Sequence, residues 1–198
     1  MSADIRTMEQ GIGCCFKMEL KYKDEIVRSM EYLAQDERVI FLGQSVGYSG
    51  NAIYNTLVTV PDEKKVELPV FEDVQMGISI GFGLEGYVPV TCYPRFDFLL
   101  LAINQLVNHL DKIRIMSKGE MTPRVIIRTS IGSTTPLDGG VQHTQDYTDV
   151  FKGLLRDNVD VILLEEPVEI FPAYEKALTR EDNKSTLLIE YGDFYNEK

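Results

Sequence analysis

The sequence predicts an α/β domain, in which a mostly parallel sheet lies in three layers with helices on both faces. Short apolar runs rich in Val and Ile alternate along the chain with longer segments that have apolar residues at helical spacing. The 198 residues, 44% hydrophobic and 26% charged, are enough for one substantial core. Because no internal repeat and no long linker divides the chain, we expect a single domain.

The first half of the chain alternates helix and strand. Asp24–Gln35 has apolar residues at helical spacing, and Arg38–Gly43 (RVIFLG) then reads as a buried strand that ends at a glycine. After a loop of turn formers and a polar stretch, Val66–Val70 is expected to be a short strand. Glu72–Leu84 has helical character, and Tyr87–Tyr93 reads as the third strand.

The second half begins with the longest expected helix, Phe96–Met116. Its first half is apolar almost all round, so we expect it to be buried. The remaining expected strands are Arg124–Thr129, Val159–Leu164 and Thr186–Tyr191, and the helices between them are Asp146–Leu155 and Val168–Leu178. The last residues, Asp193–Lys198, are polar and are expected to fray.

Charge and composition restrict the partners of the protein. The net charge of −11 and the absence of a Lys/Arg-rich run argue against nucleic acid and against an anionic membrane, which leaves small molecules and proteins. No run approaches the roughly 18 apolar residues of a membrane helix, and the first 20 residues do not resemble a signal peptide. Cys14, Cys15 and Cys92 are an odd number without metal-ligand spacing. We therefore expect a cytoplasmic protein.

A glycine-rich segment, Gly81–Gly86 (GFGLEG), matches the dinucleotide-binding fingerprint letter for letter. That fingerprint needs a strand before it and a helix after it, whereas here a helix precedes the glycines and a strand follows. We therefore predict that these glycines allow close helix packing and form a C-terminal cap. No other nucleotide, metal or catalytic-triad motif occurs in the chain.

Three ionisable residues are functional candidates. Glu72 follows an apolar segment at a strand-to-helix turn, so it is either a first-turn residue favoured by the helix dipole or a buried acid that binds a ligand nitrogen. His143 lies in the glycine-rich loop Gly139–Gln145, where its ring either faces a cleft or bonds to backbone. His109, on the long helix, is expected to be exposed or at an interface.

Several segments in a specific order carry a family resemblance. In chain order they are Arg38–Gly43 with Val46-Gly47, Leu68–Glu72, Gly86–Val90, Phe96–Phe98, Ala102–Asn108, Lys112–Arg114 with Met116-Ser117, and Gln142–Gln145. Together they resemble the N-terminal domain of the beta subunit of the decarboxylating component of 2-oxo acid dehydrogenase complexes, within the transketolase-like family. The resemblance implies a pyrimidine-binding domain of thiamine diphosphate (ThDP) enzymes over residues 21–198, after an N-terminal extension over residues 1–20.

The resemblance also implies roles for four residues. Glu72 would hydrogen-bond a ring nitrogen of the aminopyrimidine, which favours the imino tautomer that removes the thiazolium proton. Phe98 would stack on the pyrimidine, and His143 would face the substrate and transfer protons. Gln44 would lie beside the cofactor where the family usually has an acidic residue. Since an amide cannot act as a base, either the substrate differs or that acid is dispensable here.

A partner chain is implied as well. ThDP enzymes hold the diphosphate through Mg²⁺ on a separate domain with a Gly-Asp-Gly motif, which this sequence lacks. We therefore expect an alpha-type subunit that carries this motif, a heterotetramer, and no C-terminal transketolase domain in this chain. The implied activity, which needs the partner, is decarboxylation of a 2-oxo acid with acyl transfer. Ketol transfer on a sugar, or a non-catalytic scaffold that retains the fold, are the alternatives.

Overall fold

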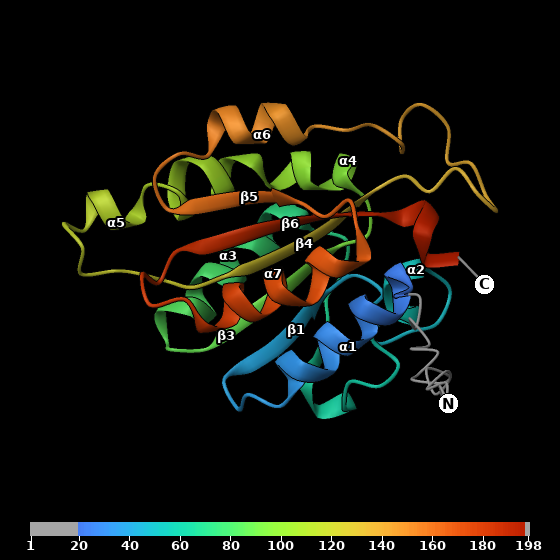
Figure 1. The fold of residues 1–198 in the computed structure, drawn as a ribbon. Coiled ribbons are helices and arrows are strands. Elements are labelled where there is room, and N and C mark those ends of the chain that lie inside the picture. Colours follow the sequence, from blue (N-terminus) through green and yellow to red (C-terminus); the bar gives the residue numbers. More distant parts are fainter. Residues whose placement is uncertain (1–19, 197–198) are drawn as a thin grey trace, which may run out of the picture.

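Six parallel strands form one sheet in the order β2-β1-β3-β4-β6-β5. The computed structural model describes residues 20–196, so most of the expected N-terminal extension, with Cys14 and Cys15, lies outside the described residues. The strands are β1 Val39–Gly43, β2 Lys65–Glu67, β3 Val88–Tyr93, β4 Ile126–Ile131, β5 Val159–Leu163 and β6 Ser185–Tyr191 (Figure 1). The predicted α/β fold is confirmed, and every strand pair is parallel.

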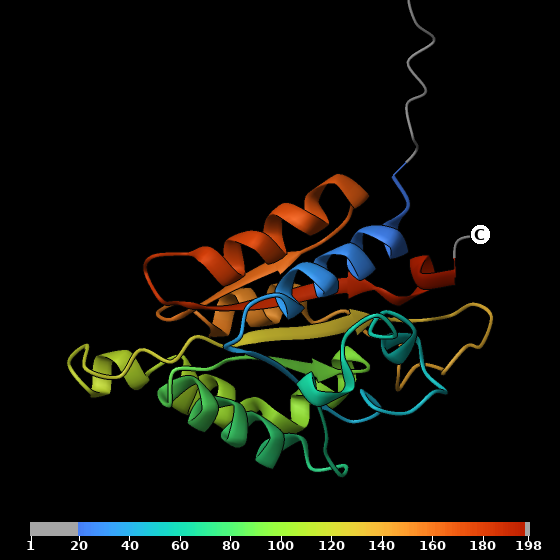
Figure 2. The ribbon, with the colours of Figure 1, turned by 90° about the horizontal axis from the view of Figure 1, so that it is seen from below.

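Helices cover both faces of this sheet (Figure 2). Helices α1 Tyr22–Ala34 and α7 Pro167–Thr179 pack together on one face, and α3 Glu72–Leu84 and α6 Thr148–Leu154 lie on the other. Each face has its own apolar core, to which successive strand residues contribute in turn. All of β3 is buried because the sheet is covered on both sides.

Short helical turns connect and close these elements. Helix α2 Ala52–Asn55 and the 3₁₀ turn η1 Asp62–Lys64 lie between β1 and β2, and η4 Gly192–Asn196 follows β6. The expected fraying of the last residues is wrong for the described part of that segment, because Tyr195 is buried in the core beside α1.

The glycines at the end of α3 have the structural roles predicted for them. Gly86 has φ +90°, and the Tyr87 N–H donates to the Phe82 carbonyl at 3.0 Å, which is the hydrogen bond of a glycine C-cap. A Cβ on Gly83 would lie 2.9 Å from Pro123 Cβ, so this glycine permits close packing against the chain before β4. A strand follows the glycines, as the sequence predicted, and not a helix.

The prediction of one long helix over Phe96–Met116 is correct as far as Leu110 and wrong beyond it. The backbone is helical throughout α4 Phe96–Leu99, η2 Leu100–Ala102, residues 103–104 and the π-helix η3 Gln105–Leu110, and α5 Ile113–Met116 follows after a turn. The break after η3 is at Asp111, whose fully buried carboxylate accepts the backbone N–H groups of Asn158 and Val159 at 2.9 and 3.1 Å. The Asp111 side chain thus links the end of η3 to the start of β5.

Two further expectations need correction. Five apolar side chains of the Phe96–Met116 segment are fully buried: Phe96, Leu99, Ala102, Leu106 and Leu110. Leu101 and Ile103, in contrast, are 63% and 37% exposed, because no described residue covers that side of the segment. The second strand, expected at Val66–Val70, ends at Glu67, since Pro69 has no N–H with which to continue the ladder.

Candidate functional site

Each of the four predicted site residues follows a different strand. Gln44 follows β1, Glu72 follows β2, Phe98 follows β3, and His143 lies in the loop after β4. These four strands are neighbours in the order β2-β1-β3-β4, and because they are parallel, their carboxyl ends lie at the same edge of the sheet (Figure 1). The topology therefore gathers residues that are up to 99 positions apart in the sequence at the edge where parallel α/β sheets bind ligands.

Gln44 and Glu72 form a hydrogen-bonded pair. Gln44 Nε2 donates to Glu72 Oε1 at 3.0 Å, and Glu72 is only 5% exposed. Glu72 is also the first residue of α3, so it has the first-turn position of one alternative and the burial of the other. Within residues 20–196, the other carboxylate oxygen, Oε2, has no hydrogen-bond partner.

The backbone around this pair is held by tight packing. Gly43 has φ +150°, and a Cβ there would lie 2.4 Å from the Cys92 carbonyl oxygen, so β1 approaches β3 more closely than any larger residue would allow. From α3, Gln75 Nε2 donates to Thr91 Oγ1 at 2.9 Å and to the Cys92 carbonyl at 3.0 Å. These contacts fix the start of α3, and with it Glu72, against the end of β3.

Tyr93 adds a further contact to Glu72. Its hydroxyl donates to the Glu72 backbone carbonyl at 3.3 Å. Burial, together with nearby acidic groups, raises the pKa of the Tyr93 phenol above its usual value. Tyr93 therefore remains protonated, and available as this donor, at neutral pH.

Phe98 and His143 form the second pair. Their ring centroids lie 5.5 Å apart at an interplanar angle of 66°, and both side chains are half-buried. His143 Nδ1 is buried without a hydrogen-bond partner in the described part of the chain. No hydrogen bond or ring contact between described residues joins this pair to Gln44 and Glu72.

The sequence analysis missed Arg95, which holds the loop of His143. Arg95 Nη1 donates to the carbonyl oxygens of Gly132 at 3.0 Å and of His143 at 2.8 Å. A Cβ on Gly139 would lie 2.9 Å both from Arg95 Nη1 and from His143 Cβ, so the loop needs glycine there. The available signal was a basic residue two positions after the third strand, and ligands of parallel α/β sheets bind beyond the carboxyl ends of the strands.

A cavity of about 450 Å³ lies at the carboxyl edge of the sheet. It is lined by residues of α2 and its N-cap Asn51, by Pro94 and Arg95 after β3, and by residues at the ends of β4 and β6. Two of the lining residues contact loops that carry predicted site residues, because Arg95 binds the His143 carbonyl and Asn51 Nδ2 donates at 3.3 Å to the carbonyl of Ser45, which follows Gln44. The cavity therefore lies between the two loops that carry predicted site residues.

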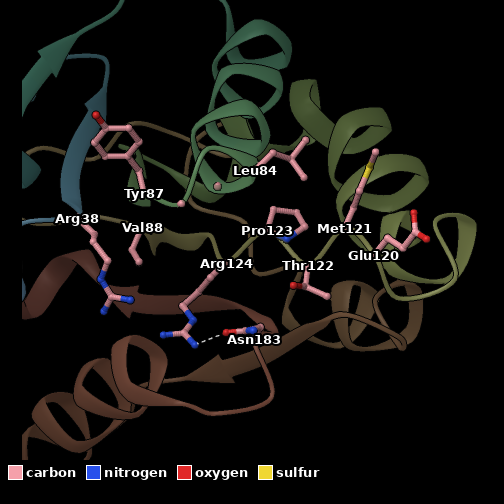
Figure 3. A pocket seen from close by; sticks show the side chains of 12 residues that line it. Arg38, Leu84, Tyr87, Val88, Glu120, Met121, Thr122, Pro123, Arg124 and Asn183 are labelled. Atoms are coloured by element: carbon pink, nitrogen blue, oxygen red, sulfur yellow. Dashed lines mark hydrogen bonds between the residues drawn. The ribbon is translucent and has the colours of Figure 1, made fainter.

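Another cavity, of about 500 Å³, lies at the opposite, amino edge of the sheet (Figure 3). It contains no predicted site residue, and its two guanidinium groups already bind protein. Arg38 pairs with Asp36 at 2.7 Å, and Arg124 donates to Asn183 at 2.5 Å and to two backbone carbonyls. Both guanidinium groups of this cavity are thus hydrogen-bonded to other residues of the chain.

The arrangement at the carboxyl edge fits an aminopyrimidine. A half-buried aromatic ring offers a stacking surface, and a buried carboxylate with one free oxygen offers a partner for a ring nitrogen.

His109 is exposed, as one of its two alternatives predicted. Within residues 20–196, no group of three or more His, Cys, Asp or Glu is placed to hold a metal ion, and no helix could span a membrane.

Comparison with known proteins gives relatives over most of the chain. The chain is 25% identical over 167 residues to "2-oxoisovalerate dehydrogenase subunit beta" of Bacillus subtilis (strain 168), covering 82% of this chain and 50% of that protein. It is 26% identical over 171 residues to "Pyruvate dehydrogenase E1 component subunit beta" of Gracilaria tenuistipitata var. liui, covering 85% and 51%. The chain thus spans about half the length of these relatives.

A solved structure shares the fold of this chain, and a family model identifies its family. The structure titled "Split gene transketolase, inactive beta4 tetramer" superposes with a TM-score of 0.57 at 14% identity, over 87% of this chain and 51% of that one, and so has the same fold. The model of the "Transketolase, pyrimidine binding domain" matches residues 28–194. The chain therefore belongs to the transketolase pyrimidine-binding domain family of ThDP enzymes and is distantly related to the beta subunits of 2-oxo acid dehydrogenases.

Proposed function

We propose that this chain supplies the aminopyrimidine-binding half of a heteromeric ThDP enzyme that decarboxylates a 2-oxo acid and transfers the acyl group. The observation that carries the proposal is the buried Glu72 carboxylate, with one oxygen held by Gln44 and the other free. A carboxylate fixed in this way can hydrogen-bond a ring nitrogen without first losing mobility. The beta subunits named above are dehydrogenase subunits, which favours a 2-oxo acid as substrate.

The residues at the carboxyl edge would share the work as follows. Bound ThDP supplies the carbon nucleophile. Glu72 would bind and orient the pyrimidine through Oε2, and Phe98 would provide its stacking surface. Nε2 of His143, which has no hydrogen-bond partner within residues 20–196, would take up and return a proton on the substrate side.

The diphosphate and Mg²⁺ would be held by an alpha-type partner chain, because these 198 residues contain no Gly-Asp-Gly motif. An exposed apolar surface beside Glu72 supports such a partner, since large exposed apolar patches are typical of protein interfaces. We call it the α3 patch, and its residues are Val70, Phe71, Val74, Ile78, Leu101 and Ile103. Two copies of each chain in a heterotetramer would give two such sites.

The decisive experiment is purification of the chain with its partners from its native cells, followed by ThDP titration and assays of the purified complex. A stoichiometric partner that contains Gly-Asp-Gly, together with turnover of a 2-oxo acid, is the expected result. Turnover of a ketose panel alone would replace decarboxylation with ketol transfer. Tight ThDP binding without turnover of either panel would favour the scaffold, and a complex that does not bind ThDP would refute the proposal.

Glu72→Gln should abolish most of the activity of the complex and leave its assembly unchanged. The substitution keeps the volume of the side chain but removes the carboxylate that would polarise the pyrimidine. Steady-state assays and size-exclusion chromatography measure the two effects. Glu85→Gln, the same chemical change at the exposed other end of α3, is the matched control and should be fully active. Full turnover by Glu72→Gln would contradict the assignment.

A further inference from the structure

The cavity at the carboxyl edge has one charged residue among those that line it, Arg95. The guanidinium is fixed in orientation, because Nη1 donates to two backbone carbonyls, those of Gly132 and His143. Its Nε and Nη2 have no hydrogen-bond partner within residues 20–196. Arg38 and Arg124 at the amino edge each donate through two guanidinium nitrogens, Arg38 to the Asp36 carboxylate, whereas Arg95 uses only Nη1 and meets no carboxylate within residues 20–196. A pre-oriented guanidinium with free donors suits an oxyanion.

The other lining residues add neutral polar groups. Asn55 and Ser133 line the cavity, and their side chains form no hydrogen bond in the described part of the chain. No acidic residue lines the cavity, although the chain as a whole carries a net charge of −11. The volume of about 450 Å³ lies in the range of small-molecule pockets. Such a site, with one cation and several neutral donors, favours an anionic ligand group over a neutral one.

We propose that the Arg95 cavity binds an anionic group of the substrate that lies away from the reacting carbon, either a phosphate or a second carboxylate. This inference rests on the proposed function and narrows its substrate class. A carboxylate that leaves as CO₂ loses its charge during the reaction, so a guanidinium bound to it would stabilise the substrate more than the transition state. An anion that persists through the reaction carries no such penalty, and its binding would position the reacting end beside Phe98 and His143.

Phosphate binding to the 198-residue chain tests the cavity directly. Inorganic phosphate is titrated at constant ionic strength into ¹⁵N-labelled chain, and the backbone N–H resonances of Gly132 and Ser133, which line the cavity, are followed in every variant. The Arg95 Nε–H resonance is followed as well in the proteins that keep Arg95. We expect saturable binding. Arg95→Gln should weaken it about tenfold, which corresponds to the loss of about one charge-assisted contact.

Because Arg95→Gln also removes the two bonds to backbone carbonyls, a second variant keeps the test decisive. Leu137→Asp places a carboxylate among the lining residues at an exposed position and leaves Arg95 intact, and we expect a similar loss of affinity. Val150→Asp, the same type of change on α6 and outside the cavity, should bind like the wild type. Unchanged binding in Leu137→Asp, or no saturable shift in the wild type, would overturn the proposal.

Paired substrates then identify the source of the anion in the complex. 2-Oxoglutarate is compared with 2-oxobutyrate, and fructose 6-phosphate with fructose. We expect Leu137→Asp, which leaves the bonds of Arg95 to the His143 loop intact, to raise KM at least about tenfold for whichever member with the additional anionic group is turned over. The counterpart that lacks this group should change little. An equal rise for both members of a pair would show that the cavity does not recognise the additional anionic group, and would overturn the anion site.

The anion site and the proposed ThDP function can be refuted independently of each other. The phosphate titration needs neither ThDP nor a partner chain, so phosphate binding that depends on Arg95 would stand even if the complex had no ThDP activity. A complex that uses ThDP but whose chain binds no phosphate would instead refute the anion site and leave the proposed function intact.

Discussion

At the scale of single residues, the site is defined by pairs and not by isolated side chains. Glu72 is oriented by Gln44, and Phe98 lies against His143. The neutral Gln44 can donate a hydrogen bond to the Glu72 carboxylate, whereas a second carboxylate so close would repel it. The departure from the usual acidic residue therefore leaves Glu72 with a favourable neighbour.

Phe98→Ala should chiefly weaken ThDP affinity. The loss of a stacking surface of this kind corresponds to about 0.5–1.5 kcal/mol beyond the buried area, or several-fold in Kd. Titration of ThDP against the assembled complex measures the effect. Phe98→Tyr, which keeps the ring, should bind nearly as the wild type does, and equal affinities for all three proteins would count against stacking.

At the scale of elements, the glycines of α3 provide a matched pair of substitutions. Gly83→Ala should destabilise the protein by about 1–3 kcal/mol, because its Cβ would meet Pro123 Cβ at 2.9 Å. Gly81→Ala, one helical half-turn earlier, has no atom within 4 Å and should be neutral or stabilising by up to about 1 kcal/mol. Chemical denaturation of both variants measures the difference in the free energy of unfolding. Equal stabilities would show that Pro123 moves aside at little cost in free energy.

The turn between η3 and α5 should depend on the charge of Asp111. Burial alone would raise the pKa of this carboxyl, but Lys112 and the backbone N–H groups near Asn158 outweigh it and hold the pKa below its usual value. A lowered folded-state pKa gives stability that is present above the unfolded value of about 3.9 and is lost as the pH falls through the folded value.

Asp111→Asn should therefore lower the free energy of unfolding by about 1–3 kcal/mol at neutral pH, with a deficit that shrinks as the pH falls below about 4. Urea denaturation at a series of pH values measures it. Asp149→Asn, at an exposed position in α6, is the control and should show no deficit. A deficit for Asp111→Asn that is constant down to the lowest pH would exclude the charge as its cause.

At the scale of the whole molecule, the α3 patch is expected to be the surface on which the partner docks. Leu101→Asp should prevent or weaken assembly without unfolding the chain, because Leu101 is 63% exposed and contributes little to the core. Val168→Asp, 65% exposed at the start of α7 on the opposite face of the sheet, should assemble normally. Co-purification with the partner and circular dichroism distinguish loss of assembly from loss of fold. Normal assembly of Leu101→Asp would place the interface elsewhere.

The fold could be predicted largely because its signals are local. Most elements lie within a few residues of their expected positions: all strands except β2, and the long helices α1, α3 and α7. The spacing of apolar residues and the positions of turn residues, which predict these elements, are short-range features of the sequence. The break in the segment Phe96–Met116 could not be predicted, because it depends on Asp111 reaching a backbone segment 47 positions later in the sequence. The spacing of apolar residues within the segment gives no information about that contact.

By itself, the sequence determined the α/β class, the parallel sheet, the family and the identity of Glu72, Phe98, His143 and Gln44 as candidates. Only the tertiary structure decided which of them meet, because pairing across the sheet edge depends on strand order, which local pattern does not encode. It also revealed Arg95 as the residue that holds the His143 loop, and the buried pair of Arg128 with Glu190 at 2.7 Å across β4 and β6. Charges in a sheet interior acquire their partners only when distant strands assemble.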